Sequence, residues 1–405
     1  MSPSPRGGGA RGEGRCTRPK AGLNATSLSP TLSPGEREQN EPLMTTTEFI
    51  SKTIRPEVRA LKAYPVTPPW PGIKLELMED AHLDAGPSTA AMREDLAERL
   101  AESAFNRYPD PSAPALKAKL REKLGIAPQH DILIGTGSDE IITMLSQAIL
   151  AGGGTVVSLE PSFAVFKNAA LAVAGRFVGV SLRPDFTLDF DAMLATVKRE
   201  QPKLIWIVYP NNPTGNLYPD DAIEQIIRAA PGLVVIDEAY EPFAQRSWMP
   251  RIDEFPNVLV MRTLSKIGLA GVRLGYIVGA PEWIGEINKV RGPFNVGVLQ
   301  QVAAEVLLDH YDELKNHATL MIEERERLLA ELAKLPGVTP FPSLANFVLA
   351  RFSDSGAVFE ALKSRGILVR NLSAMHPLMA NTLRISIGTG EQMDALIAAL
   401  KEICL

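Results

Sequence analysis

From Asp131 to Gly279 the sequence alternates short apolar segments with longer amphipathic ones, and this alternation limits the possible folds more than any other feature. The apolar segments are rich in β-branched residues and bounded by turn signals, as strands are. They are residues 131–134, 155–160, 176–182, 204–209, 233–240, 258–265 and 273–279. The alternation predicts the α/β class, with a mostly parallel central sheet covered by helices on both faces. Such sheets bind ligands at the carboxyl ends of their strands.

After Asn295 the pattern changes. A helical stretch runs over residues 298–335, strands are expected at 346–352, 367–372 and 383–389, and helices at 357–365 and at the C-terminal end. This pattern predicts a smaller α+β domain over residues 296–405, completed by an N-terminal segment, residues 44–75. The large domain is expected over residues 76–295. The charged run Ile322–Arg327 is expected to be an exposed helix face.

Residues 1–43 differ from the rest of the chain in composition. They are rich in Gly, Pro, Ser and Arg and have no helical or strand period. Such a stretch cannot bury enough apolar surface to offset the entropy lost on ordering. We therefore expect a disordered tail, or a true start of translation at Met44.

Composition excludes several functional classes. The chain has 405 residues, 45% of them hydrophobic, and a net charge of −5 with no basic block. A core of ordinary size is therefore expected, whereas nucleic acid and anionic membranes are poor partners. No apolar run reaches the roughly 18 residues of a membrane span. Cys16 and Cys404 lie near opposite ends, and neither they nor the five histidines have metal-ligand spacing. We expect a cytoplasmic protein without a metal site.

Polar residues follow several of the expected strands directly. Asp237 ends one strand, Lys266 comes just after the next, and Arg273 lies seven residues beyond the lysine. A further strand leads into Gly137 and Ser138, which open a helix. Free N–H groups and the helix dipole favour an anion such as phosphate at such a position. An amine, a carboxylate, an arginine and an anion site are thus expected at one edge of the sheet.

These groups together suit the cofactor pyridoxal 5′-phosphate. A lysine can form a Schiff base with it, and a carboxylate can keep the pyridine nitrogen protonated. Taken singly, each feature has an ordinary explanation: a strand-end Asp caps a helix, and a Lys after Ser lies on the surface. The interpretation rests on their order and on their shared position at the strand ends.

Five motifs resemble those of one known family. They are NRYPD (106–110), PNNPTG (210–215), DEAYEPF (237–243), the segment 262–276 with RTLSK and GLAGVRLGY, and LRISIGT (383–389). The sequence from about Ile54 to Cys404 resembles the fold-type I aminotransferases, and among them the histidinol-phosphate aminotransferases. The resemblance implies a large domain with the central sheet, a smaller α+β domain, and a homodimer.

The resemblance also implies roles for the cofactor site. Lys266 resembles the Schiff-base lysine that also moves the proton, Asp237 the partner of the pyridine nitrogen, and Tyr240 with Asn212 the pair that binds the phenolic oxygen. The remaining residues are expected around the phosphate and the ring: Gly137, Ser138, Ser265 and Arg273 as the phosphate cradle, Phe163 stacked on the pyridine, and Tyr108 offered by the neighbouring subunit.

For the substrates, Arg384 resembles the arginine that binds the α-carboxylate of glutamate, with Asn212 beside it. Arg370 resembles the residue that meets the phosphate of histidinol phosphate, with Tyr64 assisting. For both arginines a surface ion pair is the alternative. The segment Met78–His82 departs from the family, because it lacks the Asn and Pro of the usual Asn-Glu-Asn-Pro loop.

The expected reaction converts histidinol phosphate and 2-oxoglutarate to imidazole-acetol phosphate and glutamate, reversibly, in histidine biosynthesis. Two alternatives keep the fold and cofactor: an aromatic or broad-specificity aminotransferase, and a decarboxylase of a phosphorylated amino acid. A third is a non-catalytic sensor fused to a DNA-binding module, but residues 1–43 are too short and aperiodic to supply that module.

Overall fold

The computed structural model describes residues 44–61, 67–83 and 87–404 of the chain. The chain divides into two units, Met1–Thr53 and Ile54–Leu405. In the first, helix α1 (Thr46–Thr53) begins at a capping box: the Thr45 N–H donates to Glu48 (2.7 Å), and the Glu48 N–H donates to the Thr45 hydroxyl (3.3 Å). The expected tail, residues 1–43, lies outside the described residues, as does Tyr64.

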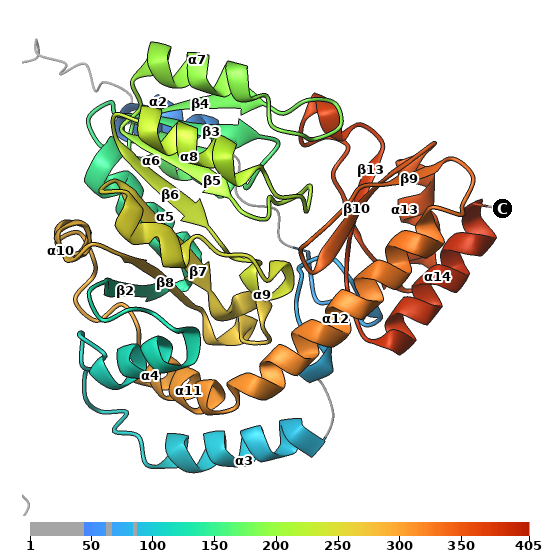
Figure 1. The fold of residues 1–405 in the computed structure, drawn as a ribbon, viewed down its shortest axis with the longest axis horizontal. Helices are drawn as coiled ribbons and strands as arrows, with labels where there is room; N and C mark the ends of the chain where they lie inside the picture. The colour runs from blue at the N-terminus through green and yellow to red at the C-terminus, as the bar shows by residue number, and fades with distance from the viewer. Residues whose placement is uncertain (1–43, 62–66, 84–86, 405) are drawn as a thin grey trace, which may run out of the picture. The chain divides into compact units, whose positions relative to one another are not determined.

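The second unit contains a seven-stranded sheet with the order β2-β8-β7-β6-β5-β3-β4 (Figure 1). Strand β8 pairs antiparallel with β2 and β7, and the other neighbouring pairs are parallel. The strands are β2 (Asp131–Thr136), β3 (Thr155–Glu160), β4 (Arg176–Ser181), β5 (Leu204–Val208), β6 (Leu233–Asp237), β7 (Val258–Thr263) and β8 (Leu274–Gly279). The expected α/β class with a mostly parallel sheet is confirmed.

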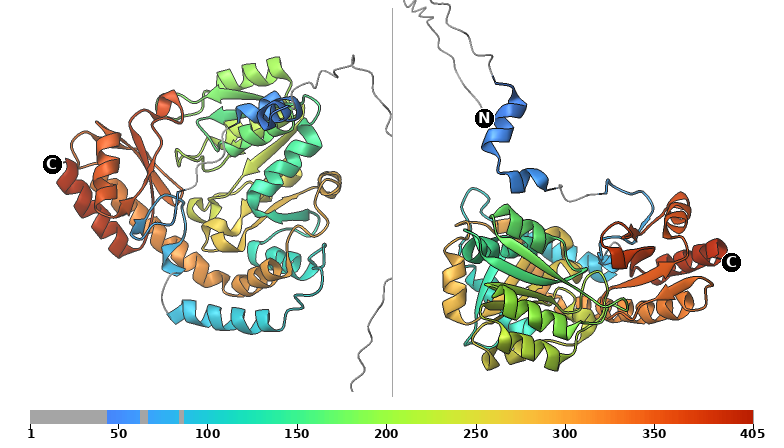
Figure 2. Two further views of the ribbon diagram at one scale, coloured as in Figure 1. Left: turned by 180° about the vertical axis from the view of Figure 1, so that it is seen from behind. Right: turned by 90° about the horizontal axis from the view of Figure 1, so that it is seen from above.

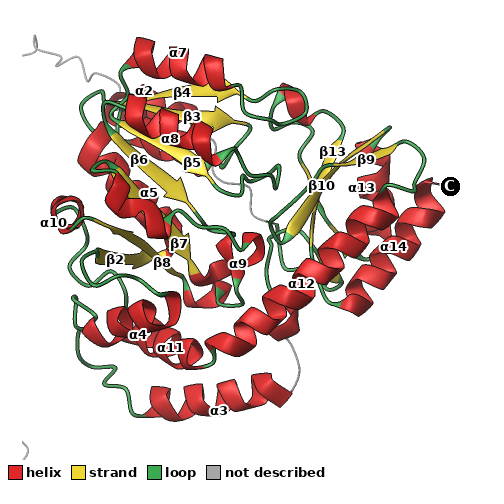
Figure 3. Cartoon of the chain, viewed as in Figure 1, coloured by secondary structure: helices red, strands yellow, loops and turns green. Residues whose placement is uncertain are grey.

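Apolar side chains cover both faces of this sheet. Along β5, Ile205 and Ile207 enter one core, while Trp206 and Val208 enter the core on the opposite face. Figure 3 shows the helices lying on either side of the strands. One core includes α4 (Pro114–Leu124), α7 (Phe190–Glu200), α8 (Asp220–Ala229) and α11 (Val298–Asp309); the other includes α5 (Gly137–Leu150), α6 (Val165–Ala172) and α10 (Pro281–Asn288). Burial on both faces explains why these strands read as continuous apolar runs.

A second sheet of four antiparallel strands has the order β12-β13-β10-β9. Its strands are β9 (Val338–Pro340), β10 (Phe347–Phe352), β12 (Arg370–Asn371) and β13 (Thr382–Ser386), and it packs with α13 (Ser355–Ser364) and α14 (Gly390–Cys404). Strand β1 (Ile73–Lys74) pairs in parallel with β11 (Ile367–Leu368). Both views of Figure 2 show this C-terminal part beside the large sheet. The second unit also contains the helices α2 (Pro56–Ala60), α3 (Pro87–Ala101) and α9 (Glu241–Ala244).

The helical stretch expected over residues 298–335 consists of two helices, α11 and α12 (Tyr311–Leu332). The helix breaks at His310, whose backbone (φ −94°, ψ 21°) leaves the helical region. Leu314 of α12 belongs to a core of the large sheet, and Ala318, one turn later, belongs to the core of the four-stranded sheet. Core membership therefore favours a domain boundary within α12, while the expected limits at residues 75, 76, 295 and 296 stay predictions.

The expectation that Ile322–Arg327 is an exposed helix face is wrong for Arg325. Its side chain is 3% exposed, and it donates hydrogen bonds to the carbonyls of Ala345 (3.2 Å) and Phe243 (3.4 Å). The guanidinium lies inward because it satisfies backbone acceptors that the core would otherwise leave unpaired. The charge pattern alone carries no sign of this contact.

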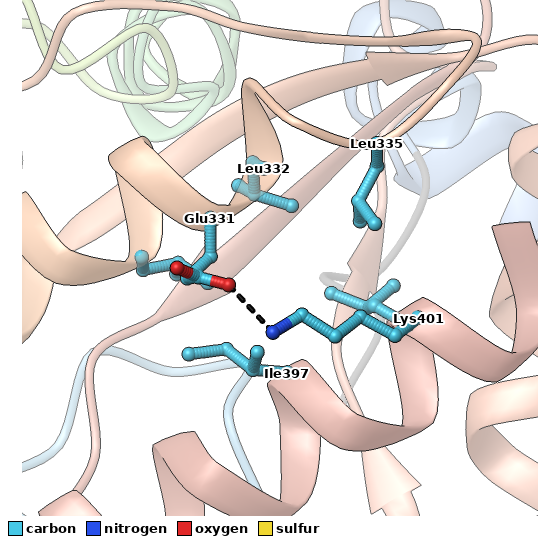
Figure 4. Close-up of a pocket in the computed structure, with 7 residues that line it drawn as sticks. Glu331, Leu332, Leu335, Ile397 and Lys401 are labelled. Carbon is cyan, nitrogen blue, oxygen red and sulfur yellow. Dashed lines mark ion pairs between the residues drawn. The ribbon is translucent and has the colours of Figure 1, made fainter. Parts of the chain in front are cut away.

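Helices α12 and α14 meet along an apolar seam with an ion pair at its margin. Figure 4 shows Lys401 of α14 facing Glu331 of α12, beside Leu332, Leu335 and Ile397, and the two charges lie 2.7 Å apart.

None of the helices among the described residues is long and apolar enough to cross a membrane.

Candidate active site

Three neighbouring parallel strands bring their following residues to one edge of the large sheet. Val208 at the end of β5 lies opposite Asp237 at the end of β6, and Asp237 lies opposite Met261 of β7. Asn212 follows β5 by a short turn, and Lys266 ends the 3-10 turn η3 (Leu264–Lys266) directly after β7. The strand order therefore gathers Asn212, Asp237 and Lys266, as expected from the sequence.

Burial shifts the ionisation of the acid and the amine toward their neutral forms. Burial raises the pKa of Asp237 to about 7, and the negative charges of Asp139 and Glu238 raise it further. The hydrogen bond from the Ala239 N–H (3.1 Å) and the positive charge of Lys266 act in the opposite direction. Desolvation lowers the pKa of Lys266 to about 8, with help from the positive charge of Arg384. An amine with this pKa is partly neutral near pH 8 and can take up a proton.

Lys266 also has a backbone partner that its sequence context does not indicate. Its Nζ donates to the carbonyl oxygen of Leu77 (3.2 Å), in the segment that follows β1. The same segment offers the Glu76 carbonyl to Arg384 Nη2 (2.9 Å). Residues 76–77 thus bind the lysine and the arginine at once.

A hydrogen-bonded chain links the strand ends to the four-stranded sheet. Asn212 Nδ2 donates to the Tyr240 hydroxyl (3.0 Å), and Arg384 Nη1 donates to Asn212 Oδ1 (2.6 Å). The ring of Phe347 supports both ends: the Arg384 guanidinium lies 5.5 Å from its centroid, and Tyr240 meets it edge-on at 5.2 Å. The structure therefore brings Arg384 to the same place as Asn212 and Tyr240.

The start of α5 lies beside Arg273, where the sequence predicts a phosphate site. Thr136 makes no side-chain cap there, and Gly137 has φ 76°. A Cβ on Gly137 would lie 2.7 Å from Nη2 of Arg273, so only glycine lets the guanidinium approach the helix terminus. Arg273 Nη1 reaches Ser265 Oγ (3.5 Å), and Nη2 binds Asp139 (3.2 Å), a contact that the sequence did not indicate. The first N–H groups of α5, Ser138 among them, have no partner within the helix, so a role in binding an anion stays a prediction for this position.

Arg370 lies directly opposite Arg384 in the pairing of β12 with β13. Its Nη1 is 3.5 Å from Oε2 of Glu76, which also accepts from Thr67 Oγ1 (2.9 Å). Glu76 is 1% exposed, and among the described residues its Oε1 has no hydrogen-bond partner. Sequence reasoning missed Glu76, because the pairing depends on how β1 and β12 are brought together.

Phe163 and Tyr108 take no part in the contacts described above. Phe163 lines a cavity of about 120 Å³ together with Ser158, Lys167 and His376. Tyr108 is 80% exposed and stacks on Phe294, with ring centroids 4.4 Å apart. Tyr64 is outside the described residues.

The fold and the arrangement of a buried amine, a buried carboxylate and an arginine at a helix N-terminus are those expected of one class of enzyme, and comparison with known proteins identifies that class. The chain belongs to the family of class I and II aminotransferases, whose sequence pattern matches residues 78–400. This family implies pyridoxal 5′-phosphate as the cofactor, and the resemblance to fold-type I aminotransferases expected from the sequence is confirmed.

Individual proteins of this family are also similar to the chain over most of its length. Histidinol-phosphate aminotransferase 1 of Burkholderia lata is 48% identical over 359 residues, 88% of this chain and 99% of that protein. Histidinol-phosphate aminotransferase 1 of Ralstonia nicotianae is 47% identical over 88% of this chain and 96% of its own length. Among solved structures, histidinol-phosphate aminotransferase from Sinorhizobium meliloti in complex with pyridoxal-5′-phosphate is similar with a TM-score of 0.75 and 28% identity, covering 87% of this chain and 97% of that one.

The buried Asp237 gives a testable pH dependence in cofactor-free protein. A carboxyl with a folded pKa of about 7, against roughly 3.9 when unfolded, holds a proton more tightly in the folded state, so stability falls as pH rises between these values. Asp237→Asn keeps an acceptor for Ala239 but has no charge to bury. We expect it to raise the unfolding temperature relative to wild type at pH 8, and the gain to become smaller at each step down to pH 5.

Thermal unfolding followed by circular dichroism at pH 5, 6, 7 and 8 measures this difference. The exposed Asp191→Asn serves as the matched control and should give no such trend. A difference between Asp237→Asn and wild type that does not change with pH would contradict the assignment of a buried, proton-holding carboxyl.

Proposed function

We propose that this chain is a histidinol-phosphate aminotransferase. It interconverts histidinol phosphate plus 2-oxoglutarate with imidazole-acetol phosphate plus glutamate, in histidine biosynthesis. The observation that carries the proposal is 48% identity to a histidinol-phosphate aminotransferase over 88% of this chain and 99% of the relative. A location in the cytoplasm stays a prediction.

The residues of the site fit pyridoxal 5′-phosphate. Its phosphate would be held by Gly137, Ser138, Ser265 and Arg273. Because Gly137 has no Cβ, the Arg273 guanidinium can lie beside the N-terminus of α5 and near the Ser265 hydroxyl, and all three groups could bind one anion. Asp237 would face the pyridine nitrogen, Asn212 and Tyr240 the phenolic oxygen, Lys266 the aldehyde carbon and Phe163 the ring face. When bound, the cofactor supplies an electron sink for breaking the C–H bond next to the substrate amine.

The chain's own groups supply the proton transfer. The Lys266 amine has a pKa of about 8, which would let it take up the proton from the substrate Cα and release it again. Burying the ionised Asp237 carboxylate alone costs free energy, and a cationic ring nitrogen opposite it would offset that cost. Asn212 and Tyr240 act together, since the amide that donates to the tyrosine accepts from Arg384.

The paired arginines support the choice of substrates. Residues directly opposite each other in an antiparallel pair have Cβ atoms about 5 Å apart, so Arg370 and Arg384 present two guanidiniums to one region. Histidinol phosphate carries a phosphate dianion, and 2-oxoglutarate carries two carboxylates. A pair of guanidinium forks can bind either doubly charged substrate in turn, as an exchange of amino groups requires.

We also propose that the active form is a homodimer. Tyr108, Phe294 and Phe105 are exposed large aromatic residues, and the first two stack on each other. Exposed aromatic side chains that gather in one place are typical of protein interfaces. In the dimer, Tyr108 would reach the cofactor phosphate of the neighbouring subunit.

Replacing the lysine tests the reaction class. Lys266→Ala removes the amine that binds the cofactor and moves the proton, so we expect kcat to fall by at least about 10³-fold. Glutamate formed from histidinol phosphate and 2-oxoglutarate measures turnover. Lys289→Ala, which alters an exposed lysine paired with Glu286, should leave the rate unchanged. Near-normal turnover by Lys266→Ala would refute the assignment.

Replacing Arg370 tests the substrate. Loss of a charge-assisted contact to phosphate should raise KM for histidinol phosphate by about 10- to 100-fold and leave KM for glutamate less affected. Arg370→Lys keeps the charge opposite Glu76 and should recover part of the loss. The exposed Arg228→Ala is the control for removing an arginine. An unchanged KM together with good turnover of phenylalanine would favour the aromatic aminotransferase instead.

A further inference from the structure

Asp80 bridges two histidines from distant parts of the chain. Its Oδ1 accepts from His82 Nδ1 (3.1 Å) and from the His82 N–H (2.9 Å), and its Oδ2 accepts from His317 Nδ1 (3.1 Å). The two imidazole rings stack with centroids 5.4 Å apart. The Asp80 side chain is 1% exposed, so the carboxylate depends on these partners. Within the described part of the chain, no cluster of such side chains can hold a metal ion.

The carboxylate also fixes how the histidines carry their protons. An ionised carboxylate only accepts hydrogen bonds, so both Nδ1 atoms must be protonated to contact it at 3.1 Å. The carboxylate therefore holds the two rings in one orientation. A single side chain thus orders His82 in the loop and His317 on α12.

The bridge lies against the turn that carries Lys266. A Cβ on Gly268 would lie 3.2 Å from Asp80 Oδ2 and 2.2 Å from Leu83, so the loop packs on this glycine. His317 lies on α12 between Leu314, which packs with the large sheet, and Ala318, which packs with the four-stranded sheet. Asp80 therefore connects the lysine turn, the loop and the point where α12 passes from one core to the other.

The segment between Glu76 and Asp80 needs support from both sides. Met78 has φ 57°, a conformation that a residue with a long side chain adopts only when its surroundings hold it. On one side, Met78 N–H donates to Ser386 Oγ (2.9 Å), and Asn346 donates to the Met78 carbonyl (3.0 Å). On the other side, the part-exposed Glu79 pairs with Lys74 (2.9 Å), and the first buried anchor is the Asp80 bridge. Between these supports, the Leu77 carbonyl meets Lys266 Nζ.

We propose that Asp80 is a positioning residue for Lys266. By clamping His82 and His317 it holds segment 76–83 so that the Leu77 carbonyl orients the lysine amine for proton transfer. A displaced acceptor misplaces the amine, and an error of about 1 Å in a reacting group can cost up to 10²-fold in rate. The kinetic part of this inference rests on the proposed aminotransferase function, whereas the structural part does not.

The test compares variants of the cofactor-loaded enzyme. Asp80→Ala removes all three hydrogen bonds that the carboxylate accepts. Asp80→Asn keeps the shape and can still bridge, because its amide accepts from one imidazole and donates to the other after a change of tautomer. His310→Ala is the matched control, since His310 also pairs with an aspartate (Asp95, 2.8 Å) but lies at the start of α12. Hydrogen exchange of peptides covering 75–83 and 264–270 is measured alongside kcat and KM.

We expect Asp80→Ala to speed exchange in both peptides by about tenfold and to lower kcat by about 10-fold, with KM for histidinol phosphate changed less than threefold. Asp80→Asn should recover most of the lost kcat and most of the protection from exchange, and His310→Ala should match wild type in both measurements. Wild-type kcat in Asp80→Ala, or faster exchange spread evenly over β10 and β13, would overturn the proposal. If Asp80→Ala does not fold, the same measurements are made on His317→Ala, and the same results support or overturn the proposal. If wild type has no transaminase activity, the proposed function fails, and hydrogen exchange still decides whether Asp80 holds the loop.

Discussion

The site depends on burial at the carboxyl edge of the parallel strands. Between β6 and β7 the structure removes a carboxyl and an amine from water, raising the pKa of Asp237 to about 7 and lowering that of Lys266 to about 8. Both shifts cost stability in the protein alone. A cationic ring nitrogen beside the acid and a carbonyl carbon beside the amine would offset those costs. The sheet thus creates an environment that favours one kind of cofactor.

The four-stranded sheet carries the two arginines that we propose bind the substrates. Arg370 and Arg384 face each other across β12 and β13, and both meet the residue Glu76, one through its carboxylate and the other through its carbonyl. Strand β1, just before Glu76, pairs with β11 of the same region. The geometry around the arginines is therefore set by chain segments almost 300 residues apart.

Much of the fold and part of the site follow from local sequence. Strands β5, β6 and β7 are continuous apolar runs, and each is followed directly by a residue of the candidate site, so their order alone gathers Asn212, Asp237 and Lys266. The break at His310 leaves no mark in the apolar period. Arg325, Glu76 and the Asp80–His317 bridge depend on contacts between distant segments, which a single sequence does not encode in its spacing. The roles given to individual site residues stay predictions.

The choice of substrate is the central claim, and one comparison with wild-type enzyme tests it most directly. L-histidinol phosphate and L-histidinol differ by the phosphate alone, so the ratio of their kcat/KM values as amino donors measures what the arginines contribute. Recognition of the dianion by two guanidiniums predicts a preference for the phosphate ester of at least about 100-fold. Equal values for the two donors, or a higher kcat/KM for L-phenylalanine, would contradict the account.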